Sequence, residues 1–178
     1  MYISDITTAA PSDERCPLET KVYEELAGLG IEYERVDNDS VEAMEECIEI
    51  QNKLGAEIRK TVVACNRQKT DYYLVVLPAE KRFDSKAFAK AMECSRLSFA
   101  SGDDMVEKLG VAPGSATVMS VLNDGDNLVK VAIDKEVADE EWFACNPGAN
   151  TTHLKFRTAD LIEKFLPACG HEPTIVEL

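Results

Sequence analysis

The sequence has few of the residues that metal centres and nucleic-acid surfaces need. It contains only two His residues, and none of its six Cys residues forms a C-x-x-C pair, so we expect no metal site. Only 19 Lys and Arg residues stand against 33 Asp and Glu residues, a net charge of −14. This charge argues against nonspecific binding to a nucleic-acid backbone, and we expect no DNA partner. An enzyme that touches only one end of a nucleic acid remains compatible with it.

Long apolar runs and export signals are also missing. No apolar stretch approaches the roughly 20 residues that span a bilayer. The N-terminal sequence lacks a basic start followed by an apolar block. We therefore expect a cytoplasmic protein with no membrane partner. The chain has 178 residues, of which 45% are hydrophobic, and this is enough for one domain with a proper core.

The spacing of apolar residues predicts a mixture of helices and strands. Helices are expected over residues 17–29, over 41–54 after a cap at Ser40, and over 85–94 after Asp84. Two more are expected, from a capping box at Ser101 to Gly110 and after a cap at Thr158. Strands are expected over residues 31–36, 57–65, 71–78, 96–100, 115–123, 128–134 and 152–156, with an extended tail. The turns 66–70 and 124–127 predict two hairpins.

This order of elements predicts a single domain of mixed α/β class, with a mixed, mostly antiparallel sheet flanked by helices. We expect the domain to cover residues 17–178 and residues 1–16 to be loosely ordered.

Lys60 is the first candidate functional residue. On a strand it shares one face with Ile58, Val62 and Ala64, so a cation stands among apolar side chains. One interpretation is a lysine at the sheet edge that reaches into solvent. The other is a lysine at the mouth of a pocket, where it binds an anionic or hydroxyl-rich ligand.

Two Pro-Gly turns are the next candidates. The segment "LGVAPGSATV" (109–118) can aim backbone N–H groups at an oxygen, as in an oxyanion hole, or can be an ordinary turn. The segment "FACNPGANTTHLKF" (143–156) is either a solvated turn or the rim of a pocket. His153 lies on the strand face opposite Leu154 and Phe156, so we expect it to face solvent. No Ser-His-Asp set, P-loop or G-x-G-x-x-G fingerprint is present.

Four segments occur together in an order typical of one family: "IRKTVVACN", "RLSFAS", "LGVAPGSATV" and "NPGANTT". From about residue 17 onward, the chain resembles the YbaK-like aminoacyl-tRNA editing domains. It is most similar to the free-standing PrdX or ProX branch, which is related to the insertion domain of prolyl-tRNA synthetase. The resemblance implies a deacylase that hydrolyses the ester of mischarged tRNA, typically alanine on the proline tRNA, without metal or cofactor. The implied partners are the 3′ end of an aminoacyl-tRNA and possibly a synthetase.

The resemblance also implies roles for individual residues. Lys60 would contact the terminal adenosine. The loop Gly114, Ser115, Ala116 and Thr117 would bind the reacting carbonyl while water attacks, with help from the ribose hydroxyl. Asn146, Asn150, Asn38 and Ser98 would line the pocket.

The chain departs from the family at three positions. Asn146 and Asn38 stand where His is usual, and Val118 stands where many members have Pro. Because Asn cannot gain a charge, a second hypothesis is a non-catalytic sensor of an amino acid or an aminoacyl-tRNA end. A third hypothesis, favoured by the acidic surface, is a protein-interaction module.

Overall fold

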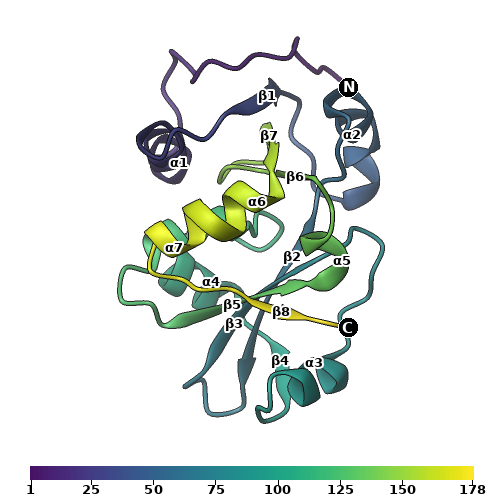
Figure 1. Cartoon of the computed structure of the whole chain (residues 1–178), viewed down its shortest axis with the longest axis vertical. Coiled ribbons are helices and arrows are strands. Elements are labelled where there is room, and N and C mark those ends of the chain that lie inside the picture. The colour runs from purple at the N-terminus through teal and green to yellow at the C-terminus, as the bar shows by residue number, and fades with distance from the viewer.

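The computed structural model describes all 178 residues, and its strands form two sheets (Figure 1). The strands are β1 (Tyr33–Asp37), β2 (Lys60–Asn66), β3 (Tyr72–Leu77), β4 (Leu97–Phe99), β5 (Val129–Asp134), β6 (Trp142–Cys145), β7 (Thr152–Arg157) and β8 (Thr174–Val176). The α-helices are α1 (Pro17–Gly28), α2 (Ile48–Leu54), α3 (Ser85–Ala91), α4 (Gly102–Leu109), α5 (Lys135–Ala138), α6 (Thr158–Asp160) and α7 (Leu166–Ala168). The 3₁₀ helices η1 (Met44–Cys47) and η2 (Val118–Asn123) and the π-helical turn η3 (Leu161–Phe165) complete the set. The predicted mixed α/β, mostly antiparallel class is confirmed.

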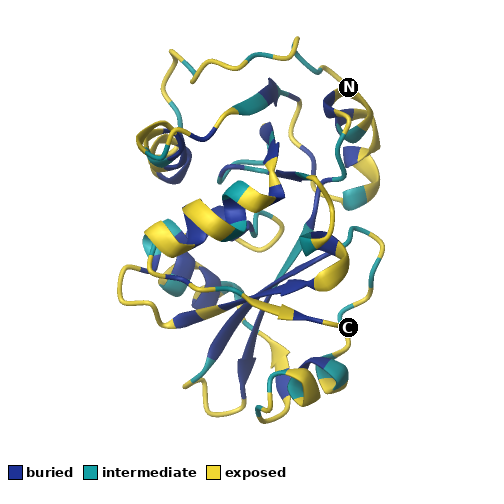
Figure 2. Ribbon diagram, viewed as in Figure 1, coloured by how far each residue is buried: buried dark blue, intermediate teal, exposed yellow.

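The larger sheet has five strands in the order β4-β2-β3-β5-β8. Strand β2 pairs antiparallel with both β3 and β4, so the first predicted hairpin is confirmed. Strands β5 and β8 are added in parallel beyond β3. All six residues of β3 are buried, as expected for a central strand that is covered on both faces (Figure 2).

The second predicted hairpin is wrong. Residues 118–123 form η2, which begins where the Thr117 hydroxyl accepts a hydrogen bond from the Met119 N–H. Strand β5 instead pairs in parallel with β3, so a long crossover joins the two strands. All residues from Val118 to Val121 are buried. A short apolar run of this kind can form either a buried strand or a buried helical turn, so the sequence pattern alone does not distinguish them.

The smaller sheet has three antiparallel strands in the order β1-β7-β6. Val36 lies opposite His153 in β7, and Cys145 of β6 lies opposite Leu154. An isolated parallel bridge between Ile58 and Ala144 connects this sheet to the residues just before β2. Lys60, the first residue of β2, therefore lies near the junction of the two sheets.

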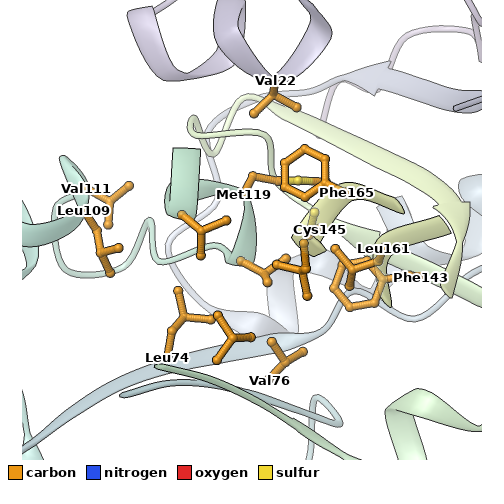
Figure 3. Close-up of a cluster of buried hydrophobic side chains, with 14 of the residues drawn as sticks. Val22, Leu74, Val76, Leu109, Val111, Met119, Phe143, Cys145, Leu161 and Phe165 are labelled. Carbon is orange, nitrogen blue, oxygen red and sulfur yellow. The ribbon is translucent and has the colours of Figure 1, made fainter. Parts of the chain in front are cut away.

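The main hydrophobic core lies between the two sheets and the helices that pack on them. It joins Leu74 and Val76 of β3 to Phe143 and Cys145 of β6, and Phe165 of η3 closes it (Figure 3). A smaller cluster on the other face of the three-stranded sheet contains Val36 and Ala144, which pack against Ile50 and Leu54 of α2. Helix α2 thus covers a sheet face that does not point into the main core.

The predicted helix ends are partly confirmed. Asp84 caps α3, Ser101 and Asp104 form the capping box of α4, and Gly55 ends α2 in a left-handed conformation. Ser40 is not a cap, because the second helix begins at Met44, where the Glu46 carboxylate accepts the N–H groups of Glu42 and Ala43. Thr158 is the first helical residue rather than the cap, and its buried hydroxyl has no partner.

The N-terminal segment runs along β1. Ile3 and Thr7 form isolated bridges with Asn38 and Arg35. Arg15 donates hydrogen bonds to Asp37 and to Thr152, both at 2.9 Å. The loose order of residues 1–16 in solution stays a prediction. None of the helices has both the length and the apolar character needed to cross a membrane.

Candidate functional site

A cavity of about 200 Å³ lies where the two sheets meet. Five segments enclose it: the chain from Val41 to Cys47, the start of β2 with the two residues before it, the loop around Gly114, the loop that follows β6, and β7 at His153. Of the residues that the sequence singled out, five line this cavity together: Lys60, Gly114, Ala116, Asn146 and Asn150. They come from three separate stretches of the chain, so the fold brings most of the expected site into one place.

Lys60 stands at the mouth of the cavity and is partly exposed. Its ammonium group donates a hydrogen bond to the backbone carbonyl of Lys81. The Lys81 side chain is held by Asp134 at 2.8 Å and by Glu136 at 2.7 Å, which fixes the loop that carries this carbonyl. Partial burial and the neighbouring charge of Arg82 lower the pKa of Lys60. One hydrogen bond leaves two N–H donors of Lys60 for a ligand.

The loop around Gly114 borders the cavity and carries two backbone N–H groups that are unpaired within the protein. The N–H groups of Gly114 and Ala116 make no hydrogen bond within the protein, whereas the N–H of Ser115 donates to the Ala112 carbonyl at 3.0 Å. Gly114 has φ of 86°, a left-handed conformation that other residues rarely adopt. Unpaired N–H groups at the wall of a cavity can bind a carbonyl or carboxylate oxygen.

The loop that follows β6 is tied to the Gly114 loop by two hydrogen bonds. The Asn150 side-chain amide donates to the Gly114 carbonyl at 3.0 Å, and the Thr117 hydroxyl donates to the Asn146 carbonyl at 2.7 Å. Gly148 has φ of 125°, and a Cβ atom there would lie 2.9 Å from Leu18 Cγ. Only glycine fits this position, so the loop is held in one shape and forms the rim of the cavity.

Four residues predicted for the site do not line the cavity. Ser98 is exposed on the edge strand β4, where it lies opposite Cys65 of β2. Ser115 is half-buried outside the lining, and Thr117 is buried where its hydroxyl joins the two loops. Asn38 is also buried behind the wall.

The prediction that His153 faces solvent is wrong. His153 is 2% exposed and lines the cavity, and its Nδ1 atom lies 2.9 Å from the Oδ1 atom of Asn38. Burial lowers the pKa of His153 to about 4, so its imidazole is neutral near pH 7. The alternation of β7 correctly places His153 opposite Leu154, but the η1–α2 segment covers that second face. The apolar stripe at Val41, Cys47, Ile50 and Leu54 is the sequence signal that could have revealed this cover.

A wider groove of about 1000 Å³ adjoins the cavity and shares Ala43, Met44, Lys60 and Thr61 with it. Its walls include Arg82, Phe83 and Phe99. The ring of Phe99 is 68% exposed and lies 5.9 Å from the ring of Phe83. The groove therefore offers an aromatic surface and a cation next to the mouth of the cavity.

Another hollow, of about 890 Å³, lies over Trp142 on the three-stranded sheet. Lys155 and Arg157 flank the Trp142 ring at 4.7 and 4.8 Å from its centroid, and they pair with Glu34 and Glu141. These cations are already neutralised, and none of the predicted site residues lies there. The cavity beside Lys60 is therefore the candidate site. No three His, Cys, Asp or Glu side chains gather anywhere in the structure as ligands for a metal ion.

Comparisons with known proteins agree on one family. The chain is 29% identical over 157 residues to the prolyl-tRNA editing protein ProX of Acetoanaerobium sticklandii, covering 88% of this chain and 95% of that protein. It is 28% identical over 165 residues to the prolyl-tRNA synthetase associated domain-containing protein 1 of Mus musculus, covering 89% of this chain and 95% of that protein.

A crystal structure of a candidate trans-editing enzyme for prolyl tRNA synthetase shares the fold. It superposes with a TM-score of 0.66 at 15% identity and covers 93% of this chain and 99% of that one. The model of the aminoacyl-tRNA editing domain family matches residues 38–164, which include every residue that lines the cavity. The chain therefore belongs to the aminoacyl-tRNA editing domain family.

Proposed function

We propose that the protein is a trans-editing deacylase that hydrolyses the ester of mischarged tRNA, with alanyl-tRNA(Pro) as its first substrate and no metal in the reaction. The observation that carries this proposal is the meeting of Lys60 with the unpaired N–H groups of Gly114 and Ala116 at one small cavity. The cavity thus combines a cation at its mouth with donors for an oxyanion, in a chain of the editing family.

In the proposed reaction, a water oxygen attacks the carbonyl carbon of the aminoacyl ester. The bond between this carbon and the ribose oxygen then breaks, the ribose oxygen takes a proton that the attacking water gives up, and the free amino acid leaves. Gly114 and Ala116 would donate hydrogen bonds to the negative charge that develops on the carbonyl oxygen, a contribution that typically accelerates acyl transfer by about 10²–10³-fold per donor. Lys60 would hold the terminal adenosine so that its ester meets these donors.

The size of the cavity supports a small amino acid. Val41, Ala43, Met44 and Cys47 form part of its wall, and a hydrogen bond between Asn150 and Gly114 joins the two loops that border it. A synthetase pocket built for proline rejects a smaller amino acid poorly, because one missing methylene changes binding by only about 1–3 kcal/mol. A second site that admits only the smaller residue restores accuracy.

The adjoining groove is suited to bind the single-stranded 3′ end of the tRNA. Phe99 and Phe83 offer rings on which a base can stack, which is worth about 1–3 kcal/mol per base, and Arg82 offers a charge for a phosphate. The net charge of −14 leaves little attraction for the body of the tRNA. We propose that a synthetase or another partner delivers the substrate.

The test is deacylation of a panel of charged proline tRNAs that carry alanine, proline, serine or cysteine. Lys60→Ala is compared with wild type and with Lys86→Ala, which removes an exposed lysine of α3 outside the cavity. We expect fast loss of alanine by wild type and Lys86→Ala, and at least about a 100-fold slower loss by Lys60→Ala. If the folded wild type hydrolyses no ester, the deacylase proposal fails. Stabilisation by an aminoacyl ester without turnover would then favour the sensor hypothesis.

A further inference from the structure

The side-chain amide of Asn38 has a fixed orientation. Its Nδ2 atom donates hydrogen bonds to two backbone carbonyls, that of Asp39 at 2.7 Å and that of Asn150 at 3.0 Å. The opposite orientation would place an oxygen against both carbonyls, and neither contact could then form. The Oδ1 atom of Asn38 is therefore an acceptor that points at His153.

This acceptor determines which nitrogen of His153 carries the proton. The Nδ1 atom of His153 lies 2.9 Å from Asn38 Oδ1, so Nδ1 must be the protonated nitrogen that donates to it. In the neutral ring, Nε2 then has a free lone pair. Nε2 makes no hydrogen bond within the protein, and it is not among the buried atoms that are sealed from solvent without a partner. It is an unused acceptor on a residue that lines the cavity.

His153 lies deeper in the cavity than the groups expected to bind the ester. Lys60 lies at the mouth and Gly114 is exposed, whereas His153 is 2% exposed and belongs to the floor. The other buried residues of the lining are Val41, Cys47, Ile58 and Arg59. The mouth therefore presents donors, which suit a carbonyl and ribose oxygens, and the floor presents a neutral acceptor, which suits a hydrogen-bond donor.

We propose that His153 is a substrate-binding residue whose Nε2 atom accepts a hydrogen bond from the α-amino group of the aminoacyl ester. Every ester of an amino acid with a primary α-amino group has this hydrogen-bond donor. An ester of a carboxylic acid without the amino group cannot make the contact. Asn38 is the positioning residue, because it holds the imidazole in the accepting tautomer. The inference rests on the proposed deacylase function, which it deepens by naming the group that the floor recognises.

The test is a cycle of two changes, one in the substrate and one in the protein. The substrates are alanyl-tRNA(Pro) and propionyl-tRNA(Pro), in which a hydrogen replaces the α-amino group. The key variant is His153→Asn, because an Asn amide at this position can still donate to Asn38 but has no atom in the place of Nε2. His153→Gln is the matched control, since its amide oxygen reaches the place of Nε2. Thermal unfolding verifies that both variants fold.

A hydrogen bond to a charged group is worth about a 10- to 100-fold change in kcat/KM. We expect wild type to prefer the alanyl over the propionyl ester by about this factor. His153→Asn should lose the preference because it cleaves the alanyl ester more slowly. His153→Gln should retain part of the preference. Equal preference in wild type and His153→Asn would overturn the proposal. If seryl-tRNA(Pro) loses more than alanyl-tRNA(Pro) in His153→Asn, the acceptor reads a side-chain hydroxyl and the proposal is also wrong.

Binding of unreactive analogues separates this inference from the deacylase proposal. The probes are 3′-alanylamino-3′-deoxyadenosine and 3′-propionylamino-3′-deoxyadenosine, whose amides resist hydrolysis. Tighter binding of the alanyl analogue, by about 10-fold or more in wild type but not in His153→Asn, supports amino-group recognition whether or not an ester is cleaved. Equal Kd values for the two analogues in wild type would overturn it even if deacylation is fast.

Discussion

The two faces of the sheet β1-β7-β6 differ in what covers them. On one face, Phe143, Leu154 and Phe156 pack into the main core, and all three are fully buried. On the other face, Val36 and Ala144 pack against α2, and His153 lies beside them next to a cavity. The first face is mostly apolar and has polar side chains only towards one end, at Arg35, Asp37 and Thr152. The second face buries His153 and Asn38, which are hydrogen-bonded to each other. A small sheet thus provides both stability and a site, on opposite sides of the same strands.

The largest expected effect is a loss of stability when a buried ring on the apolar face is removed. Phe143→Ala should lower the free energy of unfolding by about 3–5 kcal/mol, because a fully buried ring leaves a cavity behind. Phe99→Ala is the matched control: its ring is 68% exposed, and we expect a change within about 0.5 kcal/mol. Urea unfolding at pH 7 measures both. Similar losses for the two variants would contradict the assignment of Phe143 to the core.

The second prediction concerns the polar face and its response to acid. The pKa of His153 is lowered from 6.5 to about 4 by burial, so the unfolded chain binds a proton that the folded protein does not between these two values. Stability should therefore be complete above about pH 6.5 and fall as the pH drops toward 4, by about 3 kcal/mol in all. The difference in unfolding free energy between wild type and His153→Asn, measured from pH 7 to pH 4, isolates this contribution. A difference that does not change with pH would show that His153 is not buried in its neutral form.

These two faces also show which structural features can be predicted from the sequence and which cannot. The alternation of β7 correctly assigns Leu154 and Phe156 to one face and His153 to the other. It does not tell which of the faces is solvated, because this depends on where η1 and α2 pack. The parallel position of β5 was equally hidden, since local patterns carry no information on crossovers between distant strands.

Of the candidate site residues, those in the two Pro-Gly loops were predicted best, because Pro and Gly fix the backbone conformation of a turn. Gly114 and Asn150 lie in Pro-Gly loops, and these loops do meet at the cavity with Lys60. Ser98 was chosen from a motif without a physical reason for its side chain, and the structure places it at the exposed edge strand β4. Asn38 was expected in the lining, but it lies behind the wall, where its side chain is hydrogen-bonded to His153.

The third prediction tests whether the rim of the cavity needs its fixed shape. Gly148→Ala combines a φ of 125° with a contact of 2.9 Å to Leu18, and strain of this kind costs roughly 1–3 kcal/mol. Gly125→Ala is the control, because nothing lies within 4 Å of an added Cβ there. We expect Gly148→Ala to lose stability and also deacylation rate, since the loop must shift away from Gly114. A Gly148→Ala protein with wild-type stability would show that the loop adapts freely.

The smallest expected effect lies at the end of the sheet, where the N-terminal segment attaches. Asp37 is partly buried, but its hydrogen bonds from Arg15, Arg35 and Thr152 lower its pKa to about 2. This contribution is present above the ordinary pKa of 3.8 and is lost as the pH falls toward 2. After allowance for solvent screening, Asp37→Asn should cost about 1–2 kcal/mol at pH 7. Asp126→Asn, in an exposed turn, should cost nothing measurable, and equal stability of the two variants would contradict the role of Asp37.

The most direct test of the account is single-turnover deacylation of alanyl-tRNA(Pro) by wild type and by Lys60→Ala at equal, saturating protein concentration. We expect rapid release of alanine by wild type and a rate near the uncatalysed background for Lys60→Ala, with the same melting temperature for both proteins. Release at the wild-type rate by a folded Lys60→Ala protein would show that the reaction does not depend on the cavity described here.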